Sequence, residues 1–342
     1  IAQEGYFHQE RRDAFPQARY RANNTDHQIV WTQGFYHRAK SGTDLRFSCG
    51  TLRTVIDVNR DTLSSTKVLA MAEVTIKGAG IIGLSIAWEC IQRGVKVQVI
   101  DPHGIGAGSS GGIVGALAPH VPENWNEKKA FQFESLQMAQ TFWEHVDRTS
   151  GLNSGYARTG RIQPLLDDAG LSLANERGEN AKSLWQGTAE WRVVDQQPEW
   201  APPSTTGKWI FDSLSARIQP RNAIASIAQA IQKSGGEFHR SAADSGKVVW
   251  AAGEWDLNRI SEYTGKSFGN GVKGQAALFD YDQRTQPQIF ADALHFIPQA
   301  EGTLAVRSTS EREYDSDSST DEHLNSVNAR ALTILHNLQN PK

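Results

Sequence analysis

Three glycines and one aspartate of this chain have the spacing of a dinucleotide-binding site. Gly78, Gly80 and Gly83 form a G-x-G-x-x-G pattern, and Asp101 follows 23 residues after Gly78. In such a pattern the first glycine permits a tight turn, the second lets the backbone approach a pyrophosphate, and the third lets a helix pack closely on a strand. Asp101 is placed to accept hydrogen bonds from ribose hydroxyls, and a carboxylate there disfavours the 2′-phosphate of NADP.

The segments around this pattern have the periodicities needed to position it. Residues 73–77 alternate polar and apolar side chains, as a strand does, and an apolar-periodic helix is predicted from Leu84 to about Arg93. A second alternating strand follows at 95–100 and stops at Asp101. The helix N-terminus would face the phosphates with unpaired N–H groups, so the whole order of elements supports dinucleotide binding.

A loop of small residues after Asp101 favours FAD over NAD. A second backbone-rich cradle suits a large, bent dinucleotide, because its pyrophosphate and flavin take donors from more than one loop. A surface loop without a ligand remains the alternative. The small residues of this loop are Gly104, Gly106, Gly108, Ser109, Ser110, Gly111, Gly112 and Gly115.

The same loop contains a rival motif. The five residues 108–112 fit G-x-S-x-G, the nucleophile elbow of serine hydrolases. That elbow needs a strand directly before the serine, and residues 102–107 have no strand pattern. A serine hydrolase at Ser110 is therefore a less favoured alternative.

The composition indicates the general class of protein. The 342 residues carry a net charge of -3, and 39% of them are hydrophobic, which is enough for two packed domains. The two cysteines, Cys49 and Cys90, cannot form a disulfide framework or a four-ligand zinc site. We therefore predict no metal and expect a cytoplasmic location. The apolar runs are shorter than the roughly 18 to 20 residues of a membrane span.

The first 70 residues differ from the remainder. They hold 10 Lys and Arg against 7 Asp and Glu, whereas residues 71–342 hold 25 against 31. Residues 1–70 have no sustained hydrophobic period and are predicted to be an extension of uncertain structure. The net charge of -6 over residues 71–342 argues against a nucleic-acid partner, which would require a basic face.

From Lys77 to His120 the chain resembles the opening of the D-amino-acid oxidase family of FAD-dependent amine oxidases, most closely its glycine oxidase-like branch. Similar segments follow in the family's order, and together they cover roughly residues 72–340. They are YARTGRIQP at 156–164, SARIQPRNAIASIAQA at 215–230, KVVWAAG at 247–253, GVKGQ at 271–275, HFIP at 295–298 and TSE at 309–311.

The resemblance implies an α/β fold in which a doubly wound, Rossmann-like FAD-binding domain is interrupted by an antiparallel-sheet α+β substrate domain. The implied FAD-binding parts are 71–150 and 215–265, the substrate-domain parts are 151–214 and 266–312, and 313–342 would begin a C-terminal helical return. The predicted cofactor-binding residues are Gly78, Ala79, Gly80, Ile82, Gly83, Asp101, Ser109, Ser110, Gly111, Gly112, Ala252 and Gly253.

The resemblance also implies an activity: oxidation of an amino acid or related amine by hydride transfer to flavin N5. The implied partner is a small-molecule substrate, and neither a catalytic residue nor an oligomeric state is assigned. Arg161 and Lys273 are basic residues within similar segments, and His295 stands where glycine oxidases place a tyrosine. These three residues are the candidates for the substrate pocket, although a structural histidine remains the alternative at position 295.

Two departures from the family pattern bear on activity. Arg307 stands where the family has a small, glycine-rich turn. The chain is also expected to stop, at Lys342, before the family's arginine that grips the substrate carboxylate and before a last glycine-rich turn. A catalytically impaired FAD- or nucleotide-binding remnant of such an oxidase is therefore the alternative function.

Two other features have plainer interpretations. The acidic run at 311–322 does not fit a calcium loop, because Thr320 stands where the sharp turn needs glycine. We predict a solvated turn that caps the last helix through Asp321 or Thr320. A group of tryptophans is predicted to pack in the core rather than to stack on a ligand. These are Trp185, Trp191, Trp200 and Trp209.

Overall fold

The computed structural model describes residues 71–342 except 270, 308–309, 317–318 and 339–342, so the predicted extension at 1–70 lies outside the described residues. The helices are α1 Ile81–Gln92, α2 Glu127–Ser150, α3 Asp168–Leu184, α4 Pro220–Lys233, α5 Trp255–Thr264 and α6 Glu322–Ile334, with a short 3-10 helix, η1, at Ser109–Gly111. The strands are β1 Val74–Lys77, β2 Val97–Ile100, β3 Ala116–Leu117, β4 Arg161–Pro164, β5 Trp191–Val194, β6 Trp209–Asp212, β7 Ala216–Arg217, β8 Glu237–His239, β9 Lys247–Trp250, β10 Ala276–Phe279, β11 Gln288–Ala291, β12 Leu294–Pro298 and β13 Leu304–Arg307.

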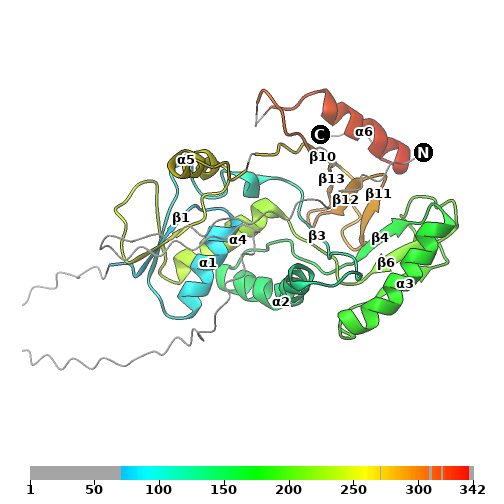
Figure 1. Ribbon diagram of the computed structural model, residues 1–342, viewed down its shortest axis with the longest axis horizontal. Coiled ribbons are helices and arrows are strands. Elements are labelled where there is room, and N and C mark those ends of the chain that lie inside the picture. The colour runs from blue at the N-terminus through cyan, green and yellow to red at the C-terminus, as the bar shows by residue number, and fades with distance from the viewer. Residues whose placement is uncertain (1–70, 270, 308–309, 317–318, 339–342) are drawn as a thin grey trace, which may run out of the picture.

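A parallel sheet with the strand order β8-β2-β1-β9 forms the left-hand lobe in Figure 1. β1 pairs in parallel with β2 and β9, and β2 pairs in parallel with β8. The carboxyl ends of these strands therefore lie at one edge, which is where ligands bind in open α/β sheets. The two strands predicted at 73–77 and 95–100 are present as β1 and β2.

Helices α1, α4 and α2 pack one after another beside this sheet (Figure 1). Ile76 of β1, Leu84 of α1, Ile227 of α4 and Val146 of α2 are fully buried in one hydrophobic cluster. Pro220 stands at the start of α4, where its fixed φ suits the helix and its missing N–H is not needed. This shared core holds the glycine turn before α1 in a fixed position.

The right-hand lobe in Figure 1 is built on a seven-stranded sheet with the order β10-β13-β12-β11-β4-β6-β5. Neighbouring strands are antiparallel except β11 and β4, which are parallel. The predicted fold class is confirmed, and this one parallel pair is a difference from a purely antiparallel sheet. The pair is possible because the chain between β4 and β11 passes through α4 and β9, which makes the connection long enough for a crossover.

The two faces of the seven-stranded sheet differ in character. α6 packs on one face, where Leu294, Phe296, Leu304 and Val306 are buried together with residues of the helix. Side chains alternate along a strand, so the residues between these four point to the opposite face. The strand register places Arg161, Asp212, Gln288, His295 and Arg307 on that opposite face.

Buried amides connect this opposite face to the cofactor lobe. The side-chain amide of Gln288 donates to the carbonyl oxygen of Ala216 in β7 at 3.1 Å. The side-chain amide of Gln299, which follows β12, donates to the carbonyl oxygen of Ile113 at 2.6 Å. Ile113 lies within the small-residue loop, between Gly112 and Gly115, so this face of the sheet is turned toward that loop.

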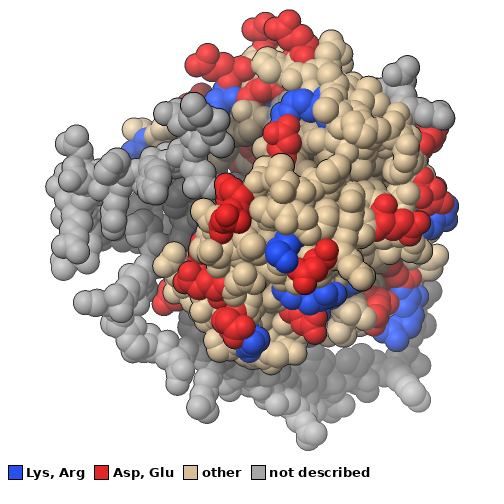
Figure 2. Space-filling model, turned by 90° about the vertical axis from the view of Figure 1, so that its right-hand side faces the viewer, with Lys and Arg blue, Asp and Glu red and all other residues tan. Residues whose placement is uncertain are grey.

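The surface of the substrate lobe is mixed in charge. Figure 2 shows acidic and basic side chains interspersed on one face of the molecule, without a broad area of positive charge. Among the described helices, none combines the length and apolar character needed to cross a bilayer.

Candidate functional site

The glycine turn after β1 is shaped so that only glycine fits at two of its positions. Gly78 has a φ of +111°, and a Cβ atom on it would lie 2.3 Å from the carbonyl oxygen of Ala251. A Cβ atom on Gly83 would lie 2.0 Å from the carbonyl oxygen of Gly78. The first and third glycines therefore let β9, the turn and α1 approach one another closely, as their spacing predicts.

Asp101 joins the end of β2 to this turn. Its Oδ2 accepts a hydrogen bond from the backbone N–H of Ala79 at 2.8 Å. Its Oδ1 accepts from the N–H groups of His103 at 2.9 Å and Gly104 at 3.1 Å. The carboxylate thus lies at the carboxyl ends of the two central strands, beside the second residue of the glycine motif.

The N-terminus of α1 has the character of an anion site. Gly80 is the N-cap, it provides no side-chain cap, and the first turn has no acidic residue. The positive end of the helix dipole would favour a phosphate there. Ile82, in this first turn, is 44% exposed.

The small-residue loop folds back over this helix end. The Ser110 hydroxyl accepts from the N–H of Ile81 at 3.0 Å, and the N–H of Gly106 donates to the carbonyl oxygen of Ala79 at 2.9 Å. Ser109, Ser110 and Gly111 form η1, not the strand-to-helix turn of a nucleophile elbow. The hydrolase alternative therefore loses its structural basis.

A cavity of about 320 Å³ opens at the carboxyl ends of the parallel strands. Gly78, Asp101 and Ala252 all contribute to its lining, so the structure brings these predicted residues together. Gly253 follows Ala252 at a positive φ of +67°, where the chain turns from β9 toward α5.

Aromatic and basic side chains line the same cavity, and the sequence analysis did not identify them. The rings of His103 and Trp255 lie 4.0 Å apart, and the guanidinium of Arg259 lies 4.4 Å from the ring centre of Trp250. Trp250 is the last residue of β9 and His103 lies two residues after Asp101. These residues could have been recognised from the sequence, because they lie at or shortly after the ends of predicted strands. Such positions border the edge of a parallel sheet where ligands bind.

Arg161 is paired within the seven-stranded sheet. Its Nε lies 2.9 Å from Oδ2 of Asp212, which is the residue opposite it on β6. Both side chains are buried, and the N–H is not aimed straight at the oxygen, so the contact is an ion pair rather than a hydrogen bond. Arg161 therefore lies on the face of the sheet opposite α6 with its charge already compensated.

His295 lies on the same face and is half-buried. Burial lowers the pKa of its imidazole, and the charges of Arg161 and Arg307 lower this pKa further. Its Nδ1 is buried without a hydrogen-bond partner among the described residues. The register of β12 and β13 places His295 directly opposite Arg307. The structure thus brings two of the three predicted substrate-pocket residues, Arg161 and His295, to one face.

Lys273 lies elsewhere, at the start of α6. Its Nζ is 2.9 Å from Oδ2 of Asp321 and 3.7 Å from Oε2 of Glu311. The hydrogen bond that Lys273 donates to Asp321 is the main reason that the pKa of Lys273 is raised. Two carboxylates therefore compensate the charge of Lys273, and the pair with Asp321 ties it to the start of α6.

The acidic run is organised around this lysine. Asp321 is the N-cap of α6 and accepts from the N–H of His323 at 2.9 Å, so the prediction of an Asp321 cap is confirmed. Hydrogen bonds from Gln275 and then from Lys273 hold the pKa of Asp321 well below its usual range. Glu311, Asp321 and His323 lie close together, but the Lys273 ammonium already supplies the positive charge between the carboxylates.

The predicted tryptophans are packing residues. Trp185, Trp191, Trp200 and Trp209 are each no more than 5% exposed, and Trp185 packs edge-on against Trp191. They are not exposed for stacking on a ligand. The sequence prediction that they belong to the core is therefore confirmed.

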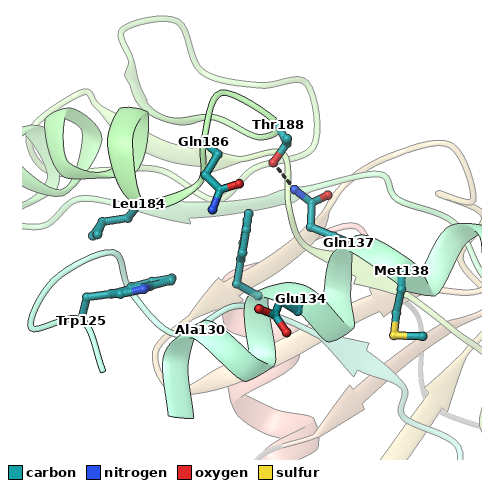
Figure 3. Close-up of a pocket in the computed structure, with 9 residues that line it drawn as sticks. Trp125, Ala130, Glu134, Gln137, Met138, Leu184, Gln186 and Thr188 are labelled. Carbon is teal, nitrogen blue, oxygen red and sulfur yellow. Dashed lines mark hydrogen bonds between the residues drawn. The ribbon is translucent and has the colours of Figure 1, made fainter. Parts of the chain in front are cut away.

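A second hollow of about 530 Å³ lies between the start of α2 and the chain after α3 (Figure 3). Trp125 forms one side, and Gln137 donates a hydrogen bond to Thr188 across its rim. Glu134 is the acidic residue in its lining, and it has no basic partner there. The hollow lies apart from the glycine turn and has no arrangement of groups that would perform a reaction.

The comparisons with known proteins agree with this geometry. Residues 73–341 match the family described as FAD dependent oxidoreductase, so the chain belongs to that family. ThiO, an oxidoreductase of Rhizobium etli, is 26% identical over 202 residues, which cover 55% of this chain and 56% of ThiO. The tRNA-modifying protein MnmC of Albidiferax ferrireducens is 40% identical over 70 residues, which cover 20% of this chain and 11% of MnmC.

The fold is that of solved amine-oxidising enzymes. The glycine oxidase of Geobacillus kaustophilus superposes with a TM-score of 0.64 at 17% identity, over 78% of each chain. The matched segment covers just over half of ThiO and about a tenth of MnmC. The chain is thus an FAD-dependent flavoprotein with a glycine oxidase-like fold.

Proposed function

We propose that this chain oxidises an amino acid or a related amine, acting on a CH–NH or CH–NH2 group. The observation that carries the proposal is the position of the polar sheet face. Arg161, His295 and Arg307 share a face whose strand ends reach, through Gln299, the loop that follows the glycine turn. A small substrate between this face and the cofactor loop would meet both positive charge and a neutral imidazole.

We propose that FAD is held along the carboxyl edge of the parallel sheet. The cavity beside Asp101 has the aromatic and polar lining that the adenosine half requires, and the N-terminus of α1 suits the pyrophosphate. The loop from Ser109 to Gly112, which reaches Ile113 and thereby Gln299, would support the flavin side. Gly78, Ala79, Gly80, Ile82 and Gly83 would allow close approach of the backbone, and Ala252 and Gly253 would form a further edge.

The bound flavin supplies the redox chemistry by accepting a hydride from the carbon that bears the amine. The residues of this chain would then orient the substrate and keep water away from the reacting carbon. His295 stays neutral near pH 7, because its pKa is lowered, so it presents a hydrogen-bonding imidazole without adding a further charge.

We favour a small amine over a tRNA substrate, although MnmC is among the relatives. Residues 71–342 carry a net charge of -6. A tRNA-binding face needs clustered Lys and Arg, and the face in Figure 2 has both signs interspersed. An FAD-binding protein without turnover is the alternative function.

The test is the visible spectrum and amine turnover of the purified chain. We expect bound FAD, and bleaching of its absorbance when glycine, sarcosine or another small amino acid is added without oxygen. Bound FAD that no amine in a broad panel reduces would support the alternative without turnover. A chain that neither retains nor takes up FAD would refute the proposed function.

A further inference from the structure

Two side chains hold the small-residue loop by its backbone carbonyl groups. The Nε–H of Arg221, the second residue of α4, donates to the carbonyl oxygen of Gly111 at 2.8 Å. The side-chain amide of Gln299 donates to the carbonyl oxygen of Ile113 at 2.6 Å. Arg221 belongs to the cofactor lobe and Gln299 to the substrate lobe, so each lobe holds one of two alternate peptide groups in the same loop.

These bonds fix the direction of two backbone N–H groups. The C=O and N–H of a planar trans peptide point in opposite directions. The N–H groups of Gly112 and Val114 therefore point away from Arg221 and Gln299. Among the described residues, neither of these N–H groups has a hydrogen-bond acceptor, and Gly112 is exposed. The loop thus presents two unpaired donors whose orientation is set before a ligand binds.

The Gln299 amide is itself held at both ends. Its Oε1 accepts from the Thr303 hydroxyl at 2.9 Å and from the side-chain amide of Gln219 at 3.4 Å, so its nitrogen is the atom directed at Ile113. Its backbone N–H donates to the carbonyl oxygen of Thr303 at 2.8 Å. Gln299 is 5% exposed, and a buried amide with both ends bonded has little freedom to turn. It is therefore a rigid connection from β12 to the loop.

We propose that Gln299 and Arg221 are positioning residues that aim the N–H groups of Gly112 and Val114 at the ring of the bound flavin, and that they thereby raise its reduction potential. This rests on the placement of FAD under the proposed function. Reduction adds negative charge to the flavin ring, and N–H donors that are already oriented stabilise this charge more than they stabilise the oxidised ring. Through Gln299, the substrate lobe sets the reactivity of a cofactor bound to the other lobe.

The midpoint potential of bound FAD, measured on the full chain by equilibration with a reference dye, tests this proposal. Gln299→Met replaces the amide with a side chain of similar size that has no N–H donor. We expect the affinity for reduced FAD, relative to that for oxidised FAD, to fall about 3- to 10-fold. For a two-electron couple this fall lowers the potential by about 15 to 30 mV.

Arg221→Lys keeps the test decisive if Gln299→Met does not fold. Arg221 is exposed on α4, so its replacement leaves the core intact. Lysine keeps the positive charge but lacks the Nε–H that Gly111 accepts, and it should lower the potential by less than Gln299→Met does. The shift then reports the lost hydrogen bond and not a lost charge.

Asn222→Leu is the matched control. The side-chain amide of Asn222, also on α4, donates to Glu301 at 2.8 Å. This bond joins α4 to the turn after β12 without contacting the small-residue loop, so its loss should leave the potential unchanged. A fall equal to that in Gln299→Met would ascribe the effect to contact between the lobes in general and overturn the positioning role.

The other outcomes separate this proposal from the proposed function. An unchanged potential in Gln299→Met and Arg221→Lys, with FAD bound, would overturn the positioning role. Equal weakening of oxidised and reduced FAD would also overturn it, because the N–H groups would then bind the pyrophosphate that both forms share. A lowered potential in a chain whose FAD no amine reduces would retain the positioning role and refute amine oxidation. A chain that takes up no FAD would refute both.

Discussion

Asp101 shows how a single carboxylate can organise a binding edge. Its two oxygens accept three backbone N–H bonds, one from the glycine turn and two from the start of the small-residue loop. Hydrogen bonds to an ionised acceptor are stronger than those between neutral groups. The residue therefore fixes the two cradles relative to each other and leaves lone pairs for a ligand.

Asp101→Asn should weaken FAD binding by at least about tenfold, because one acceptor oxygen is replaced by an NH2 group that faces backbone donors. Quenching of flavin fluorescence on titration with the protein measures this. Glu237→Gln is the control, since Glu237 is an exposed acid on β8 of the same sheet. Equal loss of FAD affinity in both variants would show that net charge, rather than the position of Asp101, matters.

The buried pair of Arg161 and Asp212 should be costly to break from one side. Asp212→Asn leaves the guanidinium buried without a counter-charge, and we expect a loss of about 3–5 kcal/mol in the free energy of unfolding. Urea denaturation measures this loss. Adding Arg161→Met to the same variant should recover most of the stability, because the uncompensated charge is then gone. If the double variant does not regain stability, the hydrogen bond that Asp212 accepts from the N–H of Ser215 contributes more to stability than the ion pair with Arg161 does.

The His295 imidazole makes the stability of the fold depend on pH, and the direction of this dependence follows from its lowered pKa. Its pKa in the folded protein is below 6.5, first because of burial and then because of Arg161 and Arg307. The unfolded chain therefore binds the proton more readily, so this residue's effect on stability is constant above pH 6.5 and becomes destabilising as the pH falls toward the folded pKa. Arg307→Gln should raise the pKa of His295, measured by NMR titration, while Arg192→Gln, at an exposed position on β5 of the same sheet, should leave it unchanged.

At the scale of elements, the approach of α1 to β1 is set by Gly83. Gly83→Ala would place a Cβ atom 2.0 Å from the carbonyl oxygen of Gly78, so the helix must move away from the turn. We expect a loss of about 1–3 kcal/mol or more in stability and a clear loss of FAD affinity, measured by thermal unfolding and flavin titration. Gly108→Ala is the control, because its Cβ atom would be no closer than 3.7 Å to Trp255. Equal stability of both variants would contradict the packing role of Gly83.

Some element boundaries were predictable and others were not. The alternation at 95–100 and the glycine at 94 gave β2 and the end of α1. The start of α1 at Ile81, three residues before the predicted Leu84, was missed because its N-cap is a glycine without a capping side chain. The family-like segment at 271–275 makes an isolated bridge from Lys273 to Glu311, and the Lys273 side chain pairs with Asp321 at the start of α6.

At the scale of the whole molecule, two hydrophobic cores support the domain division that the resemblance implies. One core joins residues of β1, α1, α2 and α4, and another joins β10 to β13 with α6. We propose that 71–150 and 215–265 form the FAD-binding domain and that 151–214 and 266–312 form the substrate domain. The helix at 322–334 packs on the substrate sheet, which makes it part of that domain's core.

FAD should stabilise the whole molecule by mass action. At a free concentration about 100 times its dissociation constant, FAD adds about 2.7 kcal/mol, which raises the melting temperature by about 5 to 10 °C. Differential scanning fluorimetry, read through tryptophan emission, measures this. NADP at the same concentration should have a much smaller effect, because Asp101 disfavours its 2′-phosphate. A larger shift with NADP than with FAD would contradict the cofactor assignment.

The sequence by itself determined the glycine turn, the flanking strands and helix, Asp101 and the FAD class of cofactor. These features lie within residues 73–115, and their geometry follows from local periodicity and from the steric demands on glycine. Only the tertiary structure decided which charges are free. Arg161 and Lys273 looked like available cations, but partners distant in the sequence, Asp212 and Asp321, compensate them. The pairing of β12 with β13 places Arg307, which is exposed, directly opposite His295.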